Sequence, residues 1–467
     1  MLKLAWRSLA VAGVMVVVGG FPLAGARAQG PGDWTTYLNN QARTGYNSAE
    51  TVITPATAPN LTQLWTAAAG GAISAEPVQA DGVVYYGSWD GYEYAVDAAT
   101  GTTLWQSPYL GQLISTACDP STLGVGSTAA IGAITVNGIP TQAVFVGGGN
   151  SNLYALDANT GAVIWNTALG VATQPYRFLW SSPLLYNGSV YEGVASCGNG
   201  RASGEVIQVN MATGTVQNTL RTQPSGCLGA SVWGSPAVDT ATGDLYFGTG
   251  NNAGQCTEPL AVAVVQTDSS LNVLSSWQVP ASQQPNKDSD FGSTPTLFTA
   301  TLNGTVHQMV GLANKNGIYY AIDRSAIASG PVWQKRISGG GACPECGSAD
   351  ISPSAWDSKR LYVGGEKASI GGVACAGSIR AVRPATGGTV WADCLQSGPV
   401  LGAVTAVPGV LFVGAGNTVY GINASTGAIL WSYQDTTSGS NFWGALTISN
   451  GQVYAGNQDG NLYAFHT

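Results

Sequence analysis

The segment AVDAATGTTLW, residues 95–105, decides the fold of this chain of 467 residues. Before it, residues 83–87 and 92–96 alternate as half-buried strands do, on either side of the tight-turn pair Asp90-Gly91. Within the segment, the side chain of Asp97 can bond its own backbone and glycine tolerates a positive φ, so a second turn leads into an outer strand that ends in tryptophan. Together with an apolar stretch just upstream, the pattern predicts a unit of four short antiparallel strands.

This unit recurs along the whole chain. Residues 155–165 read ALDANTGAVIW, residues 421–431 read GINASTGAILW, and more divergent copies lie between them. The last copy stops at the C-terminus without an outer strand, whereas residues 61–65 read as an outer strand with no inner strands before it. We therefore expect an all-β fold, an eight-bladed β-propeller of four-stranded antiparallel blades, with the ring closed by the N- and C-terminal strands. The repeat tryptophans should pack between neighbouring blades.

The first 28 residues have the features of a secretion signal. Lys3 and Arg7 precede a short apolar run, and residues 26–28, Ala-Arg-Ala, form a small-x-small cleavage site. The run is too short to span a membrane, and no cysteine near the cleavage site predicts a lipid anchor. We expect residues 1–28 to be removed on export to the periplasm or the extracellular space. Residues 29–467 should form a single propeller domain, which we expect to be monomeric.

Composition excludes several functions. A net charge of −8 without a basic run argues against nucleic acid as a partner. The chain has only two histidines, His307 and His466, which makes a Ser-His-Asp triad or a histidine metal site improbable. Redox chemistry would therefore need a cofactor, because side chains do not carry hydride.

Eight cysteines in an exported chain favour disulfides, although eight allow 105 pairings. Cys343 and Cys346, or Cys375 and Cys394, are near enough in sequence to close local loops. For the pair Cys343 and Cys346 a redox or metal-binding role is also open, although we prefer a structural one. Gly347 follows Cys346 where the attachment motif for c-type haem requires histidine, so no haem is expected.

Three stretches in the middle of the chain carry side chains suited to a redox cofactor. They are Trp233-Gly234 with the GTGN of residues 248–251, the DSDFG of residues 288–292, and the NKNG of residues 314–317. A flat ring can orient a flat cofactor, a carboxylate can take a proton, and a cation can favour a reduced, anionic cofactor. Taken singly, each has an ordinary alternative as a packing tryptophan, a turn residue or a solvated loop carboxylate.

The repeat and these stretches resemble the quinoprotein alcohol dehydrogenases, which depend on pyrroloquinoline quinone (PQQ), and their propeller relatives. The resemblance implies that Trp233 forms the floor under the quinone, that Asn251 binds a calcium ion, and that Lys315 contacts the quinone. It implies that Asp290 is the catalytic base and also faces the metal. PQQ and calcium are the cofactors it implies.

The chain departs from the family pattern in the preceding blade. The turn at residues 195–203 lacks the calcium-binding glutamate, although Glu192 and Glu205 flank it, and Glu76 is a third candidate. The adjacent-cysteine ring of many members is missing, with Cys118 alone in that region. The arginine that reaches the quinone in the family also has no counterpart.

Two main hypotheses about function follow, because the fold alone does not decide it. The preferred one is an exported PQQ-dependent dehydrogenase that oxidises an alcohol or polyol, including a polymer such as polyvinyl alcohol, and passes electrons to an external acceptor. The alternative is a non-catalytic propeller that acts as a protein- or glycan-binding scaffold; a hydrolytic propeller ranks below both. A glutamate near Asn251 and Asp290, and a Trp233 that faces the channel, would favour the enzyme. The lead-in at residues 33–47 is expected to be irregular and to cap one mouth of the channel.

Overall fold

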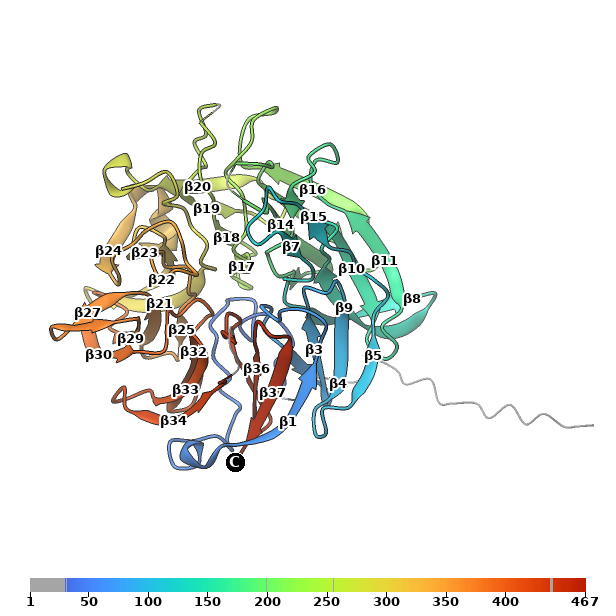
Figure 1. Cartoon of the computed structure of the whole chain (residues 1–467). Helices are drawn as coiled ribbons and strands as arrows, with labels where there is room; N and C mark the ends of the chain where they lie inside the picture. The colour runs from blue at the N-terminus through green and yellow to red at the C-terminus, as the bar shows by residue number, and fades with distance from the viewer. Residues whose placement is uncertain (1–29, 31, 199, 255, 437–439) are drawn as a thin grey trace, which may run out of the picture.

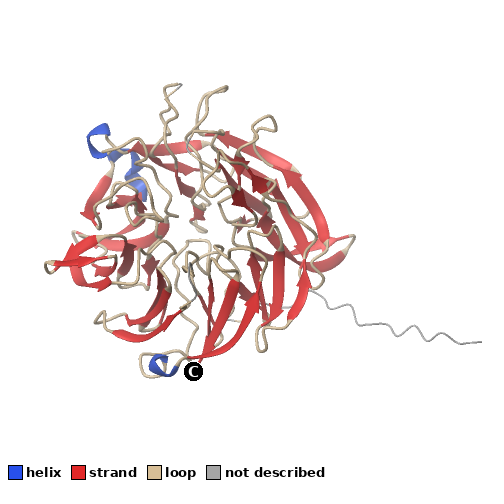
Figure 2. Cartoon of the chain, viewed as in Figure 1, coloured by secondary structure: helices blue, strands red, loops and turns tan. Residues whose placement is uncertain are grey.

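The computed structural model describes residues 30, 32–198, 200–254, 256–436 and 440–467. The predicted secretion signal, residues 1–28, lies outside this part of the chain. The described residues form an eight-bladed β-propeller, which confirms the prediction (Figure 1). Strands and loops make up almost all of it (Figure 2), and no helix among the described residues is long and apolar enough to cross a membrane.

The first four blades follow one another along the chain. From the channel outward their strands are β2–β5 (Val78–Ala80, Val83–Gly87, Glu93–Asp97, Thr103–Gln106), β8–β11 (Ala130–Val136, Ile139–Gly147, Asn152–Asp157, Val163–Ala168), β13–β16 (Leu184–Tyr186, Ser189–Ser196, Glu205–Asn210, Val216–Arg221) and β17–β20 (Ala237–Val238, Leu245–Gly248, Ala263–Thr267, Val273–Gln278). The connections on either side of blade 2 hold the short strands β6 (Leu113–Ile114), β7 (Thr122–Leu123) and β12 (Arg177–Phe178).

The other four blades complete the ring. Their strands are β21–β24 (Thr296–Leu302, Thr305–Asn314, Ile318–Asp323, Pro331–Arg336), β25, β26, β29 and β30 (Ala355–Trp356, Leu361–Gly365, Gly377–Val382, Thr389–Leu395), β31–β34 (Thr405–Val407, Val410–Ala415, Thr418–Asn423, Ile429–Gln434), and β35–β37 with β1 (Thr447–Ser449, Gln452–Gly456, Asn461–His466, Thr62–Ala68). Blade 6 carries an extra hairpin, β27–β28 (Ala368–Ile370, Val373–Cys375). The short 3₁₀ helices are η1 (Ala58–Asn60), η2 (Ala281–Gln283) and η3 (Arg324–Ser329).

Blade 8 is built from both ends of the described chain. Strand β1 pairs antiparallel with β37, with Thr62 opposite His466. This is the predicted closure, and it leaves the ring without the open sheet edges that a linear array would have.

Outer-strand tryptophans join neighbouring blades, as predicted. The indole N–H of Trp65 donates to the carbonyl of Ala98 at 2.9 Å, and its ring covers Gly101. Trp105 makes the same contact with the carbonyl of Ala158, also at 2.9 Å. Further tryptophans repeat this bond to the next blade, namely Trp165 to Met211, Trp333 to Pro384 and Trp391 to Ala424.

The irregular lead-in, residues 34–50, crosses the central channel and is called the strap below. It bonds to a residue on or beside the innermost strand of each blade in turn, through the pairs Trp34–Gln79, Thr35–Ile131, Arg43–Pro183, Gln41–Val238, Ala42–Leu297, Thr44–Trp356, Gly45–Ala406 and Asn47–Ile448. Arg43 is fully buried, and burial lowers the pKa of its guanidinium to about 10, so it stays charged at neutral pH. The expected position of this segment over the channel is therefore observed.

The contact between Trp65 and Gly101 makes a testable prediction. Gly101 has φ +69°, and a Cβ there would lie 2.7 Å from the Trp65 ring. We expect Gly101→Ala to cost about 1 kcal/mol for the positive φ and a further ~1–3 kcal/mol for the clash. The measurement is the denaturant midpoint of unfolding.

Gly82→Ala is the matched control, because Gly82 has φ +79° but no heavy atom within 4 Å of the added Cβ. Equal losses for the two variants would show that the tryptophan contact does not constrain the turn.

Candidate functional site

A cavity of about 550 Å³ lies in the channel, among the loops at one end of the blades. Tyr37 of the strap is among its lining residues, so the strap closes part of it. All four side chains predicted to form the site also line it, namely Trp233, Asn251, Asp290 and Lys315.

The antiparallel order of the strands explains why these four residues meet. Trp233 precedes the innermost strand of blade 4, and Asn251 follows the second strand of that blade. Asp290 precedes the innermost strand of blade 5, and Lys315 lies in the turn between its second and third strands. In an antiparallel blade the entry to strand one and the exit from strand two lie at the same end, so both blades present these loops to one cavity.

Lys315 links two carboxylates. Its Nζ lies 2.9 Å from Oδ1 of Asp290 and 3.0 Å from Oδ1 of Asp288, and 4.8 Å from the centre of the Trp233 ring. The amide Nδ2 of Asn251 also donates to Oδ1 of Asp288. Asp288 was not among the predicted site residues, and it places a second carboxylate beside the Lys315 ammonium, within the cavity lining.

Trp233 faces the cavity and is half-buried, unlike a tryptophan closed between blades. Its indole N–H donates to Oδ2 of Asp290 at 3.2 Å. Gly292 lies against the ring, and a Cβ at that position would approach the ring to 2.2 Å. The Trp233 ring thus has the backbone at Gly292 on one side and the open cavity on the other. A Trp233 that faces the channel is one of the two features that would favour the enzyme.

Burial and the neighbouring charges raise the pKa of both Asp290 and Lys315. Burial raises the pKa of Asp290 above its ordinary range, and Lys315 offsets only part of that effect. Burial alone would lower the pKa of Lys315, but Asp290 and Asp288 outweigh it, so the pKa of Lys315 is raised. The ammonium therefore stays charged, while Asp290 is a weaker acid than an exposed aspartate.

The second condition, a glutamate near Asn251, is not met by any of the three candidates. Glu205 forms an ion pair with Arg221 at 3.1 Å, away from the cavity. Glu192 is fully buried, which raises its pKa well above the ordinary range, and Glu76 accepts the backbone N–H of Leu38 in the strap at 2.7 Å. None of the three lines the cavity. Among the described residues, the carboxylate that Asn251 contacts is that of Asp288.

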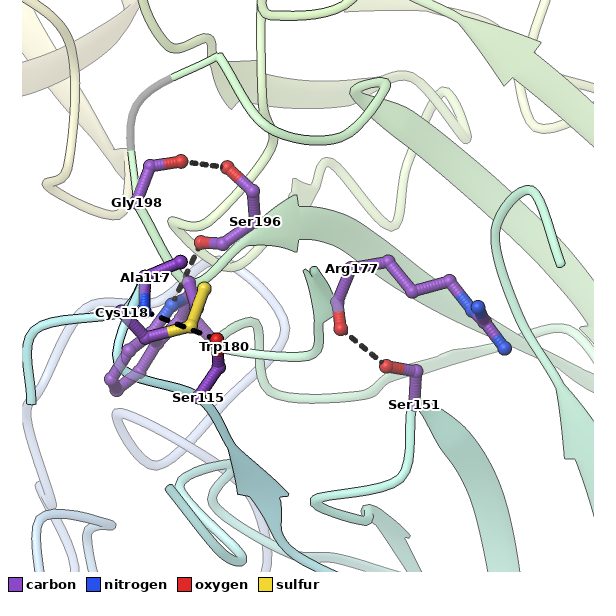
Figure 3. The surroundings of a disulfide bond; sticks show 9 residues. Ser115, Ala117, Cys118, Ser151, Arg177, Trp180, Ser196 and Gly198 are labelled. Carbon is purple, nitrogen blue, oxygen red and sulfur yellow. Dashed lines mark hydrogen bonds between the residues drawn. A yellow bond between two sulfur atoms is a disulfide. The ribbon is translucent and has the colours of Figure 1, made fainter. Parts of the chain in front are cut away.

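A disulfide between Cys118 and Cys197 joins the cavity wall to a neighbouring connection (Figure 3). Cys118 lies between blades 1 and 2, and Cys197 directly follows β14. Beside them, the indole N–H of Trp180 donates to the carbonyl of Ser196 at 3.3 Å. Cys118 therefore has a partner 79 residues away, which sequence spacing could not reveal.

The other cysteines also form disulfides. Cys343 bonds Cys346 and Cys375 bonds Cys394, so both expected local loops are closed, and Cys227 bonds Cys256. Among the described residues, the cluster Cys343, Glu345 and Cys346 is close enough to ligate a metal ion. Its two sulfur atoms are bonded to each other, which favours the structural role.

The part of the cavity formed by loops of blades 1, 3 and 8 is aromatic. Trp89, Trp180 and Trp443 line it, with ring centres 6.4 Å apart for Trp89 and Trp180 and 6.1 Å apart for Trp89 and Trp443. With Trp233, four half-buried tryptophans surround one cavity, whereas the cluster of Asp288, Asp290 and Lys315 comes from blade 5. Asp119 and Glu345 are the other charged residues of the lining. The arrangement can hold a flat ring beside a base and a cation, with apolar surface opposite.

Comparisons with known proteins bear on the family and the fold. The PQQ_2 family model, described as "Outer membrane protein assembly factor BamB", matches residues 90–269 and 375–467. A polyvinylalcohol dehydrogenase of Pseudomonas sp. is 24% identical over 86% of this chain and 69% of its own length. A second, from Sphingopyxis sp. (strain 113P3), is 23% identical over 80% of this chain and 62% of its own length. The chain thus spans about two thirds of these relatives.

A solved structure of a europium-containing methanol dehydrogenase has a TM-score of 0.73 to this chain. It is 17% identical and covers 94% of this chain and 98% of its own. At that identity the likeness shows the fold alone, and it agrees with the propeller described above.

The Lys315 contacts predict how Asp290 titrates. We expect Lys315→Met to raise the titration midpoint of Asp290 by about 1–3 pH units, because Asp290 loses the nearby cation and keeps the nearby carboxylate of Asp288. The indole N–H resonance of Trp233, identified by its absence in Trp233→Phe, reports the titration because it bonds Asp290. Lys287→Met removes an equal charge from the exposed side of the same loop and should leave the midpoint unchanged. A midpoint that does not move in Lys315→Met would contradict the ion pair.

Proposed function

The chain belongs to the PQQ_2 family of β-propeller proteins, and from this premise we propose that it is an exported, quinone-dependent dehydrogenase that oxidises an alcohol or a polyol. One observation carries the proposal. Trp233, Asn251, Asp290 and Lys315 come from four separate loops and line one cavity, where they form a single contact network with Asp288. The curated names of the relatives, polyvinylalcohol dehydrogenase among them, support the same chemistry.

The cavity fits a planar quinone cofactor. Trp233 offers a ring face held in place by Gly292 and by its bond to Asp290, and Lys315 supplies a positive charge beside that ring. A quinone bound there would accept the electrons removed from the alcohol. Lys315 would stabilise negative charge on the reduced ring, since a cation in a water-poor site acts strongly on charge that develops there.

The residues beside the quinone position also fit a divalent or trivalent cation. Asn251, Asp288 and Asp290 place an amide and two carboxylates together, which are the oxygen donors that hard cations such as calcium prefer. Asp288 here would supply the negative charge for which the sequence offered no glutamate. The proposed ligands are therefore Asn251 and Asp290, as the sequence predicted, with Asp288 added.

We assign Asp290 as the base that takes the proton of the substrate hydroxyl. Its Oδ2 accepts the indole N–H of Trp233, and Oδ1 lies 2.9 Å from Nζ of Lys315. Both neighbours hold this carboxylate at the cavity wall, where it would meet the substrate hydroxyl. Its raised pKa moves this carboxylate toward neutral pH, where a general base is most effective.

The tryptophans opposite the charged side favour a substrate with apolar carbon around the reacting hydroxyl. Trp89, Trp180 and Trp443 offer apolar surface that a chain of methylene and carbinol groups could cover. This property supports a secondary alcohol in a polymer such as polyvinyl alcohol over a small, strongly polar polyol.

Export and an external electron acceptor complete the proposal. Cleavage after Ala28 would release one propeller domain that begins at Gln29, acts as a monomer and carries four disulfides suited to an oxidising compartment. Gly347 after Cys346 breaks the haem attachment pattern, so electrons would leave to a separate carrier. The mass of the protein recovered from the periplasm tests the cleavage position directly.

The alternative function remains a scaffold that binds protein or glycan. The description of the matching family model, an outer membrane protein assembly factor, is the observation in its favour. A scaffold does not require the buried Lys315 between two carboxylates, so cofactor binding distinguishes the two proposals.

Titration of the purified protein with PQQ, with and without calcium, is the decisive binding experiment. We expect saturable quenching of tryptophan fluorescence that depends on the cation and is largely lost in Trp233→Phe. Trp391→Phe, at the ring's outer strands, is the control and should bind as the parent does. Absence of binding at micromolar PQQ with calcium or a trivalent ion would overturn the cofactor assignment and favour the scaffold.

Asp290→Asn tests the base. We expect kcat for alcohol-dependent dye reduction to fall by about 10²–10⁴-fold, since the amide cannot take the hydroxyl proton. In the parent the rate should rise with pH through the raised pKa of Asp290, because only the ionised form is a base. Asp268→Asn, in the turn at the other end of blade 4, should leave both the rate and its pH dependence intact. An Asp290→Asn variant that binds PQQ and keeps parental kcat would refute the assignment.

A further inference from the structure

A second cavity, of about 540 Å³, lies between blades 5 and 6, outside the central channel. Its walls are the end of β24 and the following turn, the extra hairpin β27–β28, and β29. We call it the blade 5–6 groove and define it by residues 336–339, 367–369, 374–375 and 380. The disulfide between Cys375 and Cys394 ties the hairpin that forms one wall to the outer strand of blade 6.

Positive charge gathers at this groove in an acidic protein. Arg336, Lys367 and Arg380 line it, and Lys335 is close enough to Arg380 that repulsion, added to the effect of burial, lowers the pKa of Lys335. These are four of the chain's 17 lysines and arginines, while the net charge is −8.

The hydrogen bonds found for the three lining cations go to neutral groups. Arg336 donates to the carbonyls of Asn316 and Ser338, and Lys367 donates to that of Cys346. Arg380 donates to the hydroxyl of Ser378 at 3.1 Å. Within the described ranges, no carboxylate lies within the 4.0 Å of an ion pair to any of them.

Arg380 occupies a position that the other blades fill differently. It precedes the residue of the third strand that pairs with the outer-strand tryptophan, here Ala381 opposite Trp391. Five blades have a buried tyrosine at the same register, namely Tyr94, Tyr154, Tyr320, Tyr420 and Tyr463. Arg380 is only 6% exposed, so a cation has replaced an interblade tyrosine. Burying that charge is costly unless a counter-charge accompanies it.

The nearest acidic groups cancel only part of this charge, through the attraction between Asp350 and Arg380. Burial raises the pKa of Asp350 to about 6, so it carries one negative charge at neutral pH, and its oxygens already accept Ser338 Oγ and the Glu366 N–H. Burial and repulsion from Asp350 raise the pKa of Glu366 to about 10, so that side chain is protonated and neutral. The groove therefore keeps an excess of positive charge.

We propose that the blade 5–6 groove binds a small polyvalent oxyanion that carries carboxylate or phosphate groups. One such group pairs with the guanidinium of Arg380, whose planar set of donors matches two oxygens of a carboxylate or phosphate. Lys367 and Arg336, both exposed, hold the remaining charge. The bound anion supplies negative charge beyond that of Asp350, which alone does not balance Arg380, Arg336 and Lys367. The site is independent of the redox function proposed above.

The test is calorimetric titration of the whole protein at low ionic strength with inorganic phosphate and, separately, with citrate. We expect saturable binding of at least one, and a loss of about tenfold or more in affinity for Arg380→Tyr, which restores the residue of the five other blades. Sodium chloride at matched ionic strength should not compete strongly. Binding of phosphate alone or citrate alone would identify the oxyanion chemistry that the groove selects.

Arg383→Gln is the matched control, because this exposed arginine lies three residues along the same blade and does not line the groove. It should bind as the parent does. Thermal unfolding gives a second readout: the anion should raise the Tm of the parent but not of Arg380→Tyr, and the anion-free variant should melt higher than the anion-free parent. Equal affinity for Arg380→Tyr and parent, an equal loss in Arg383→Gln, or no binding of either anion would overturn the proposal.

Discussion

The bond between an outer-strand tryptophan and the turn of the next blade is the constraint on which the ring depends. Each such tryptophan must place its indole N–H on a neighbouring carbonyl and its ring on a glycine, as Trp65 does with Ala98 and Gly101. The turn must therefore adopt a positive φ and present no side chain, which is why aspartate, threonine and glycine recur together. The repeated contact fixes the angle between blades, and through that angle it fixes which loops meet over the channel.

The cavity is a consequence of that geometry. Blades 4 and 5 each offer an entry loop and a turn at the same end, and the charges of blade 5 lie against Trp233 of blade 4, whose ring packs on Gly292. Buried charges elsewhere in the ring have other tasks. Arg43 secures the strap through carbonyls of blades 3 and 4, and Arg380 stands between blades 5 and 6. Arg43 thus holds backbone oxygens, and Arg380 lines the groove proposed to bind an anion.

The fold could be predicted from the sequence because its signals are local and repeated. The ALDANTGAVIW pattern indicates a turn, its glycine and the outer-strand tryptophan within eleven residues. The sequence also brought Trp233, Asn251, Asp290 and Lys315 into one site, because the family resemblance supplied the spatial relation that spacing lacks. It missed Asp288, although that residue is two positions before Asp290, because only contacts of Lys315 and Asn251 distinguish it from a solvated loop carboxylate. The pairing of Cys118 with Cys197 was beyond reach for the same reason, since it depends on two connections meeting in space. The register of Arg380 with five tyrosines was visible in the sequence and needed only an alignment of the blades.

The path of the strap bears on how such a molecule is made. Residues 34–50 reach all eight blades, and the strand that follows them pairs with β37, the last strand of the chain. The strap and β1 therefore gain these neighbours only after strands about 400 residues further along the chain have been made. Contacts between residues so far apart in sequence form slowly, because the intervening loop must close before they contribute. Closure of the ring consequently requires β37 to be present, and until then β1 lacks its partner strand and the strap lacks its contact with blade 8.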